Sequence, residues 1–125
     1  MIISDDEAAK LINKKMTALL RFTKRPPEPA TPIELVTLRD GMNDLVAKAL
    51  VKSVRDVDYS FFANNQTNCA DHGFMSTNGL KRHISTMYSP DVWDSFVSGK
   101  LKLTRIKIDY SIVEKEAPKQ KPELP

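Results

Sequence analysis

The sequence predicts an α+β domain in which an N-terminal antiparallel helical hairpin packs on a small antiparallel sheet. Apolar residues recur every three or four positions through the first 55 residues and alternate in the later ones. A chain of 125 residues with 41% hydrophobic content is enough for one core. Two short helices are expected before the final strand, so that residues 1–113 form one globular domain and residues 114–125 a flexible tail.

The first helix is predicted from about residue 5 to residue 23. Ser4 and Glu7 form a capping box, in which the serine oxygen accepts from the third amide of the helix and the glutamate reaches back. Apolar residues then continue at helical spacing as far as Leu20. The prolines from Pro26 onward end the helix because proline lacks the amide proton.

A second helix is predicted over residues 32–55. Thr31 is its cap and Pro32 its first residue. Its apolar positions keep three-four spacing and include Leu35, Leu38, Met42, Leu45 and Ala49. The short linker makes the two helices antiparallel neighbours.

The middle of the chain is predicted to hold a short strand and two short helices. The aromatic residues of 56–62 favour a strand. Ser76 or Thr77 is placed to cap a helix over about 78–87. Pro90 opens the next helix, and Gly99 is placed to end it.

The last ordered element is a strand over residues 100–113. Apolar residues occupy odd positions up to Leu103 and even positions from Ile106. A strand with one buried face then needs an extra residue, so we predict a β-bulge near Thr104 or Arg105. The alternative is two strands joined by a tight turn at this point.

Composition excludes several classes of protein. No apolar stretch is long enough to span a bilayer, and the acidic start is unlike a secretory signal. The single cysteine, Cys69, cannot form an internal disulfide, which suits the cytoplasm. Cys69, His72 and His83 are the usual ligand types for zinc, but their spacing lacks paired ligands at both ends, so we expect no metal and no cofactor.

The segment from Phe74 to Asn78, read with Glu114 and Glu116, resembles the Ser-Thr-Ser and Glu-x-Glu motifs of mono-ADP-ribosyltransferases. The resemblance covers eight residues, departs at Asn78 and lacks an upstream arginine motif. It implies an ADP-ribosyltransferase-like enzyme as a remote alternative. A helix cap and a solvated tail explain the same residues, so we expect a protein that is not an enzyme.

The apolar stripe of the second helix predicts a small interaction module, which regulates, inhibits or assembles by protein contacts. Leu38, Met42 and Leu45 are its candidate contact residues, for self-association or for a partner protein. Alternatively, the same apolar residues are buried in the hydrophobic core of the protein itself.

Nucleic-acid binding is the alternative hypothesis. The net charge is +3 and the pI about 9.0. The candidate anion-binding residues are Lys81 and Arg82 in the third helix and Lys100, Lys102, Arg105 and Lys107 on the polar face of the final strand. Such lysines also guard an exposed sheet edge.

Overall fold

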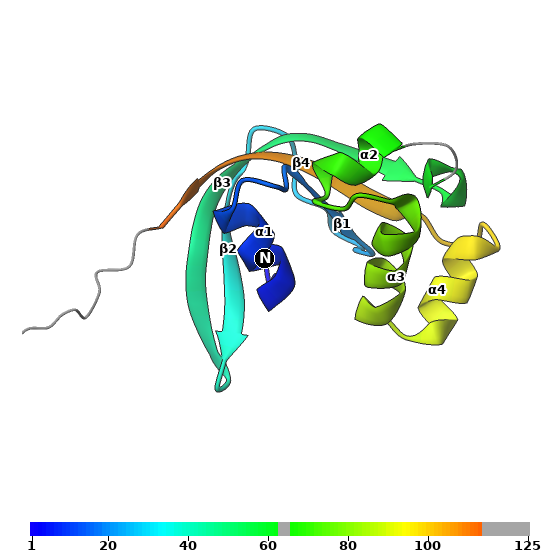
Figure 1. The fold of residues 1–125 in the computed structure, drawn as a ribbon, viewed down its shortest axis with the longest axis horizontal. Helices are drawn as coiled ribbons and strands as arrows, with labels where there is room; N and C mark the ends of the chain where they lie inside the picture. Colours follow the sequence, from blue (N-terminus) through cyan, green and yellow to red (C-terminus); the bar gives the residue numbers. More distant parts are fainter. Residues whose placement is uncertain (63–65, 114–125) are drawn as a thin grey trace, which may run out of the picture.

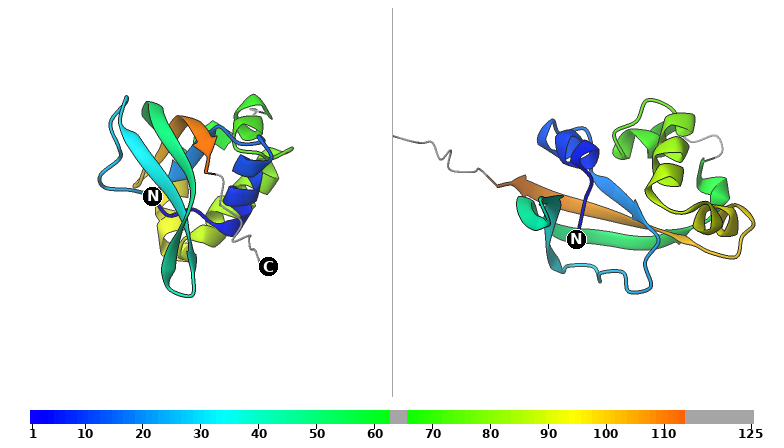
Figure 2. Two further views of the ribbon diagram at one scale, coloured as in Figure 1. Left: turned by 90° about the vertical axis from the view of Figure 1, so that its left-hand side faces the viewer. Right: turned by 90° about the horizontal axis from the view of Figure 1, so that it is seen from below.

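The computed structural model describes residues 1–62 and 66–113. A four-stranded antiparallel sheet in the order β1-β4-β3-β2 curves into a half-barrel with short helices around it (Figure 1, Figure 2). The elements are α1 (Asp5–Ile12), β1 (Ala18–Arg21), β2 (Pro32–Arg39), β3 (Met42–Val57), the 3-10 helix η1 (Tyr59–Phe62), α2 (Gln66–Asp71), α3 (Thr77–Met87), α4 (Pro90–Val97) and β4 (Leu103–Ile112). The α+β class is confirmed, whereas the prediction of an N-terminal helical hairpin is wrong.

The helix predicted over residues 32–55 is instead a β-hairpin of β2 and β3. Asp40 and Gly41 form its two-residue loop, with φ of 52° and 77°. This residue pair is the preferred one for a type I′ hairpin turn, and a helix needs negative φ at both positions. Leu38, Met42 and Leu45 therefore lie on two strands and do not form a helical stripe.

Only the first half of the helix predicted over 5–23 is helical. The capping box is confirmed, because the Ser4 hydroxyl accepts from the Glu7 amide and the Glu7 carboxylate accepts from the Ser4 amide. The helix ends at Ile12, and the positive φ of 60° at Lys14 turns the chain away. The next apolar residues enter β1, all four of whose residues are buried. Periodicity alone does not separate such a short buried strand from a helix.

Both short helices after residue 76 are confirmed. The hydroxyl of Ser76 accepts from the amide of Gly79, and that of Ser89 accepts from the amide of Val92, at the starts of α3 and α4. The strand predicted over 56–62 is wrong beyond its first two residues, because β3 ends there and η1 follows.

The final strand is confirmed as β4, but the predicted bulge near Thr104 or Arg105 is absent, since both residues pair in regular register with β3. The extra residue of this ladder is Lys52, on β3. β4 needs no bulge because Leu103 and Ile106 are buried on opposite faces of the sheet.

The two faces of the sheet carry two separate cores. Leu19 packs with α1 residues such as Leu11 in the first core, whereas Leu20 packs with η1, α2, α3 and α4 residues such as Phe96 in the second. In Figure 1, α1 lies toward the hairpin and α3 and α4 lie at the other end of the long strands. None of the helices in the described ranges is long and apolar enough to span a membrane.

Candidate functional site

Three basic side chains converge on one face of the sheet where β3 and β4 pair. The register places Arg55 opposite Arg105 and Ser53 opposite Lys107. Directly opposite residues of an antiparallel pair project from the same face, as do residues two positions apart. Arg55, Arg105 and Lys107 therefore share a face, although like charges directly opposite each other are unfavourable.

Arg105 is buried and held by side chains from α2 and the residue after it. Its Nη2 donates to Asp71 Oδ2 at 2.6 Å and its Nε to His72 Nε2 at 3.3 Å. The guanidinium also lies 5.7 Å from the centre of the Phe61 ring. Burial, and then the charge of Arg105, lower the pKa of His72 from 6.5 to about 4, so the imidazole is neutral at pH 7 and accepts this hydrogen bond.

Arg55 and Lys107 lack such partners. Arg55 is exposed and Lys107 is half-buried. Within the described residues, neither has a carboxylate at ion-pair distance. The face therefore presents two cations without an ion-pair partner beside the Arg105–Asp71 pair, and Asp109, two residues after Lys107 on β4, projects from the same face.

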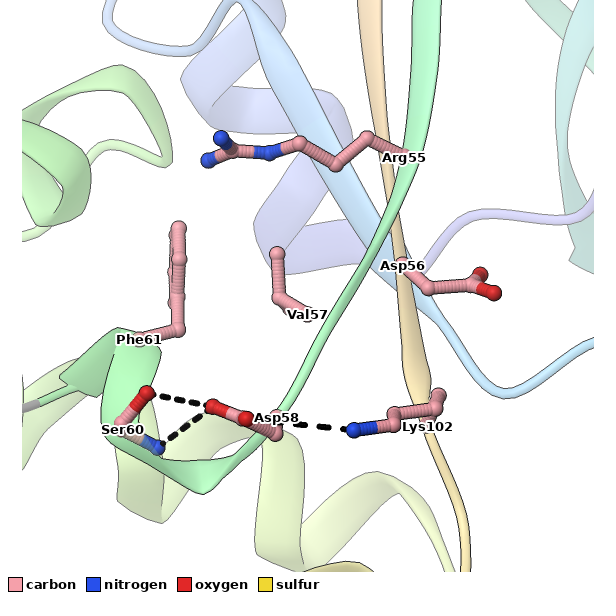
Figure 3. Close-up of a pocket in the computed structure, with 7 residues that line it drawn as sticks. All are labelled: Arg55, Asp56, Val57, Asp58, Ser60, Phe61 and Lys102. Atoms are coloured by element: carbon pink, nitrogen blue, oxygen red, sulfur yellow. Dashed lines mark hydrogen bonds and ion pairs between the residues drawn. The ribbon is translucent and has the colours of Figure 1, made fainter.

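An open hollow of about 380 Å³ lies next to Arg55 (Figure 3). Its lining residues are Arg55, Asp56, Val57, Asp58, Ser60, Phe61 and Lys102. Arg55 extends to the same side of β3 as Phe61, whereas Asp56 extends to the other side (Figure 3). One wall of the hollow thus combines a guanidinium with an aromatic ring, a pair that suits an anionic or planar ligand.

The rim of the hollow carries a carboxylate that is already engaged. The hydroxyl of Ser60 and its amide both donate to Asp58 Oδ1, and they lower the pKa of Asp58. Lys102 Nζ lies 3.8 Å from Asp58 Oδ2. The negative charge at the rim is therefore balanced locally.

The six basic residues predicted as one anion-binding group do not all lie where the sequence placed them. Lys100 and Lys102 precede β4 and are not on its polar face. Lys81 Nζ lies 3.3 Å from the hydroxyl oxygen of Tyr59. Lys102 Nζ lies near the carboxylate of Asp58, the residue before Tyr59. Lys81 therefore lies against η1 and Lys102 beside the residue that precedes η1, whereas Lys107 and Arg105 share the sheet face.

Sequence reasoning missed Arg55 and Phe61, and it included Arg82, which is exposed on α3 with no ion pair among the described residues. The helix prediction over 32–55 assigned Arg55 to a helix end, so its cross-strand partner was not considered. The stretch from Ser53 to Val57 carries no period-two signal, because its apolar residues, Val54 and Val57, are three positions apart.

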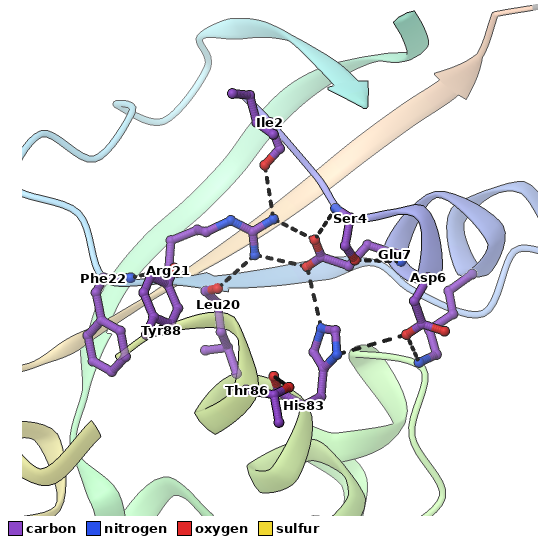
Figure 4. A network of polar contacts seen from close by, with 11 residues as sticks. Ile2, Ser4, Asp6, Glu7, Leu20, Arg21, Phe22, His83, Thr86 and Tyr88 are labelled. Atoms are coloured by element: carbon purple, nitrogen blue, oxygen red, sulfur yellow. Dashed lines mark hydrogen bonds and ion pairs between the residues drawn. The ribbon is translucent and has the colours of Figure 1, made fainter. Parts of the chain in front are cut away.

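A second polar cluster closes the half-barrel at the first core (Figure 4). Arg21 donates to both carboxylate oxygens of Glu7, at 2.7 and 2.9 Å, and to the carbonyls of Leu20 and Ile2. Ile2 in turn bridges to Val36 of β2. Arg21 therefore links β1, one edge strand of the sheet, through Ile2 to β2, the other.

Burial alone would raise the pKa of Glu7. His83, Arg21 and the Ser4 amide outweigh burial and lower that pKa from 4.5 to about 2. Because His83 Nε2 is 4.0 Å from Glu7 Oε2, beyond hydrogen-bonding distance, the two short Arg21 contacts carry most of this stabilisation. The Arg21–Glu7 ion pair is therefore saturated, whereas the buried Nε2 of His83 beside it has no hydrogen-bond partner among the described residues.

The residues considered as zinc ligands are not brought together. His72 bonds to Arg105, whereas His83 lies between Asp6 and Glu7. Cys69 is buried in the second core. In residues 1–62 and 66–113, no three His, Cys, Asp or Glu side chains are grouped to hold a metal ion.

Part of the motif that resembles those of mono-ADP-ribosyltransferases serves to cap a helix. Ser76 is the cap of α3. Glu114 and Glu116 lie outside the described residues, as does the predicted tail over 114–125.

Two large apolar side chains are exposed at the hairpin end of the molecule. Leu38 is 52% exposed and Met42 is 73% exposed, while Leu45 is half-buried. Register pairing puts Met42 opposite position 39, so Met42 and Leu38 project from opposite faces of the hairpin.

Comparisons with known proteins bear on the fold. No family model matches the chain, and no curated protein matches its sequence. Among solved structures, a tyrosine-to-phenylalanine mutant of the ASCH protein of Zymomonas mobilis is 15% identical with a TM-score of 0.54, and the alignment covers 90% of this chain and 71% of that one.

Two further solved structures are also similar to this chain in fold at low sequence identity. The Zymomonas mobilis ASCH protein itself is 14% identical with a TM-score of 0.51, covering 86% of this chain and 65% of that one. A protein from Enterococcus faecalis V583 is 9% identical with a TM-score of 0.61, and the alignment covers 84% of this chain and 66% of that one. The chain thus spans about two thirds of the length of these structures, and it has a fold similar to that of ASCH proteins.

Proposed function

We propose that this protein binds nucleic acid through the sheet face that carries Arg55, Arg105 and Lys107. The observation that supports the proposal is the register of β3 and β4, which puts three cations on one face with a single carboxylate, Asp71, bonded among them. Phosphates are the ligands that would offset the two remaining charges. The role is one of binding, without a catalytic step.

The two kinds of cation have different parts in this proposal. Arg105 is fixed by Asp71 and His72, so it contributes a rigid positive potential and keeps the face in place. Arg55 and Lys107 are free to contact phosphate oxygens. The hollow beside Arg55 and Phe61 then accommodates the sugar or base next to a bound phosphate.

Fluorescence anisotropy with labelled single- and double-stranded oligonucleotides at about 50 and 200 mM salt tests the proposal. Arg55→Glu with Lys107→Glu should lower affinity at least about tenfold and reduce the salt dependence by about one counterion per lost contact. Lys48→Glu is the matched control, because Lys48 is exposed on β3 near the hairpin. Equal affinity of the double variant and the wild type would refute the assignment.

Docking of a partner protein on the hairpin end is the second candidate function. The exposure of two large apolar side chains at the hairpin end, Leu38 on one face and Met42 on the other, favours it, since exposed apolar surface marks interaction sites. Leu38→Ser with Met42→Ser should leave thermal unfolding unchanged and abolish binding of a partner purified with the wild-type chain. Retained binding would exclude this surface. Leu45 is a poorer probe because it is half-buried.

A further inference from the structure

One edge of the sheet is open along the second half of β3. β2 pairs with β3 only as far as Leu50. Beyond it, Ala30 and Thr31 occupy the outer side of Val51 through two backbone hydrogen bonds of 2.7 and 3.0 Å. Over residues 52–56, no backbone hydrogen bond to a described residue outside the β3–β4 ladder is found. Figure 3 shows this part of β3 passing in front of β4.

The ladder fixes which backbone groups point outward. The Ile108 amide donates to Thr17, so Ile108 directs its backbone groups to β1, and Ile106, two residues earlier, does the same. Val54 is the partner of Ile106, so its N–H and C=O point away from β4 toward the open edge. The backbone N–H and C=O of Asp56, two residues later, also point toward the open edge. Such a row of unpaired groups is a template for another strand.

We propose that this edge pairs antiparallel with the same edge of a second copy of the chain, about a two-fold axis at Val54. The free stretch reads Lys-Ser-Val-Arg-Asp over residues 52–56. Paired with itself in this register, Lys52 faces the partner's Asp56, Ser53 faces the partner's Arg55, and Val54 faces the partner's Val54. All five residues then have partners, and opposite charges lie across the strands.

Other registers use the edge less well. An axis at Arg55 places two guanidinium groups opposite each other and pairs three residues instead of five. An axis at Asp56 places two carboxylates opposite each other. Hydrogen bonding agrees with the axis at Val54, because its outward N–H and C=O can bond to those of the partner's Val54.

The charges of the edge also select the partner. Lys52, Arg55 and Asp56 are exposed and Val54 is half-buried. Charged residues ordinarily keep sheet edges from pairing with foreign strands. Here Lys52 stands at one end of the stretch and Asp56 at the other. These two charges, which repel most strands, are neutralised by an antiparallel copy.

The inferred dimer goes beyond the proposed nucleic-acid binding and does not depend on it. A two-fold axis perpendicular to the sheet keeps equivalent faces on the same side. The basic faces of both copies, each with Arg55 and Lys107, would therefore become parts of one longer surface.

Sedimentation velocity of the full chain from about 1 to about 500 µM tests the dimer. The wild type should shift toward a species of twice 14.1 kDa as concentration rises. Lys52→Asp and Asp56→Lys should each sediment as monomers, because each places like charges across the axis. Lys48→Asp, an exposed lysine where β2 covers the edge, should leave the dimer intact.

Mixing the two monomeric variants is the decisive step. In the mixed pair every contact at these positions again joins opposite charges, so a heterodimer should form. Its formation also shows that both variants fold, and circular dichroism of each one separately provides an independent check. A wild type that stays monomeric at all concentrations, a dimer that survives both single substitutions, or a mixture that remains monomeric would each overturn the proposal.

Discussion

The sheet contains two buried arginines on neighbouring strands, and they are held in different ways. Arg21 on β1 and Arg105 on β4 are both 8% exposed. Arg21 donates to both oxygens of one carboxylate, that of Glu7, and to two backbone carbonyls. Arg105 has a single carboxylate bond, to Asp71, and a neutral imidazole as its other partner.

The difference lies in how far water reaches each pair. The Glu7 side chain is 1% exposed, whereas that of Asp71 is 34% exposed. Removing one member of a sealed ion pair leaves a bare charge in the core, while a half-exposed partner can be replaced by water. The first pair therefore serves to close the half-barrel, and the second leaves Arg105 beside the exposed Arg55 and the half-buried Lys107.

The largest effect is expected from breaking the sealed pair. Glu7→Gln leaves the Arg21 charge without a buried counterion, and it should lower the free energy of unfolding by about 3–5 kcal/mol. Urea denaturation measures this loss. Asp6→Asn is the control, since Asp6 is exposed in the same turn of α1 and should change stability by under about 1 kcal/mol. Similar losses in the two variants would contradict the distinction.

His72, the neutral partner of Arg105, should make the free energy of unfolding depend on pH. The folded pKa of His72 is about 4 against 6.5 for the free side chain, so the unfolded chain binds the extra proton first as pH falls. Stability should be complete above about pH 6.5 and fall by about 3 kcal/mol as the pH drops to about 4.

Glu7 acts in a lower pH window. Its pKa is lowered in the fold, so the stability it provides is present above about pH 4.5 and is lost as the pH falls toward 2. Chemical denaturation of His72→Gln between pH 4 and 6.5 separates the two residues. The variant should no longer lose stability between about pH 6.5 and 4, but it should still lose stability as the pH falls from about 4.5 toward 2. An unchanged slope in the upper window would show that His72 is not its source.

The smallest effect is expected at the half-exposed acid. Asp71→Asn keeps a side-chain oxygen toward Arg105 and loses only the charge, so stability should fall by about 1 kcal/mol. Thermal unfolding measures this change. A loss as large as that of Glu7→Gln would show that the Arg105 site is as closed as the Arg21 site, and it would weaken the case for a ligand there.

Features that depend on neighbours in the chain were predictable. The caps at Ser4, Ser76 and Ser89 each involve atoms within three residues, and all three helices start where the sequence placed them. The hairpin was equally local, because Asp40-Gly41 is its turn signal. The helix prediction rested instead on the three-four spacing of apolar residues, which two paired strands reproduce by coincidence.

The candidate site was predictable only in part. Lys107 and Arg105 were recognised as basic residues of the final strand. Their relation to Arg55 was not, because it depends on the register of two strands far apart in the sequence. The Lys52 bulge helps to set that register, and apolar residues on both faces of β4 made the sequence predict a bulge on the wrong strand.

The sequence by itself therefore determined the α+β class, the starts of three helices and the position of the last strand, because capping and turn chemistry act over a few residues. Only the tertiary structure decided how β3 pairs with β4, that Arg21 closes the half-barrel, and that Arg55 faces Arg105. These outcomes depend on burial and strand pairing between distant segments, whose free energy exceeds local helix propensity.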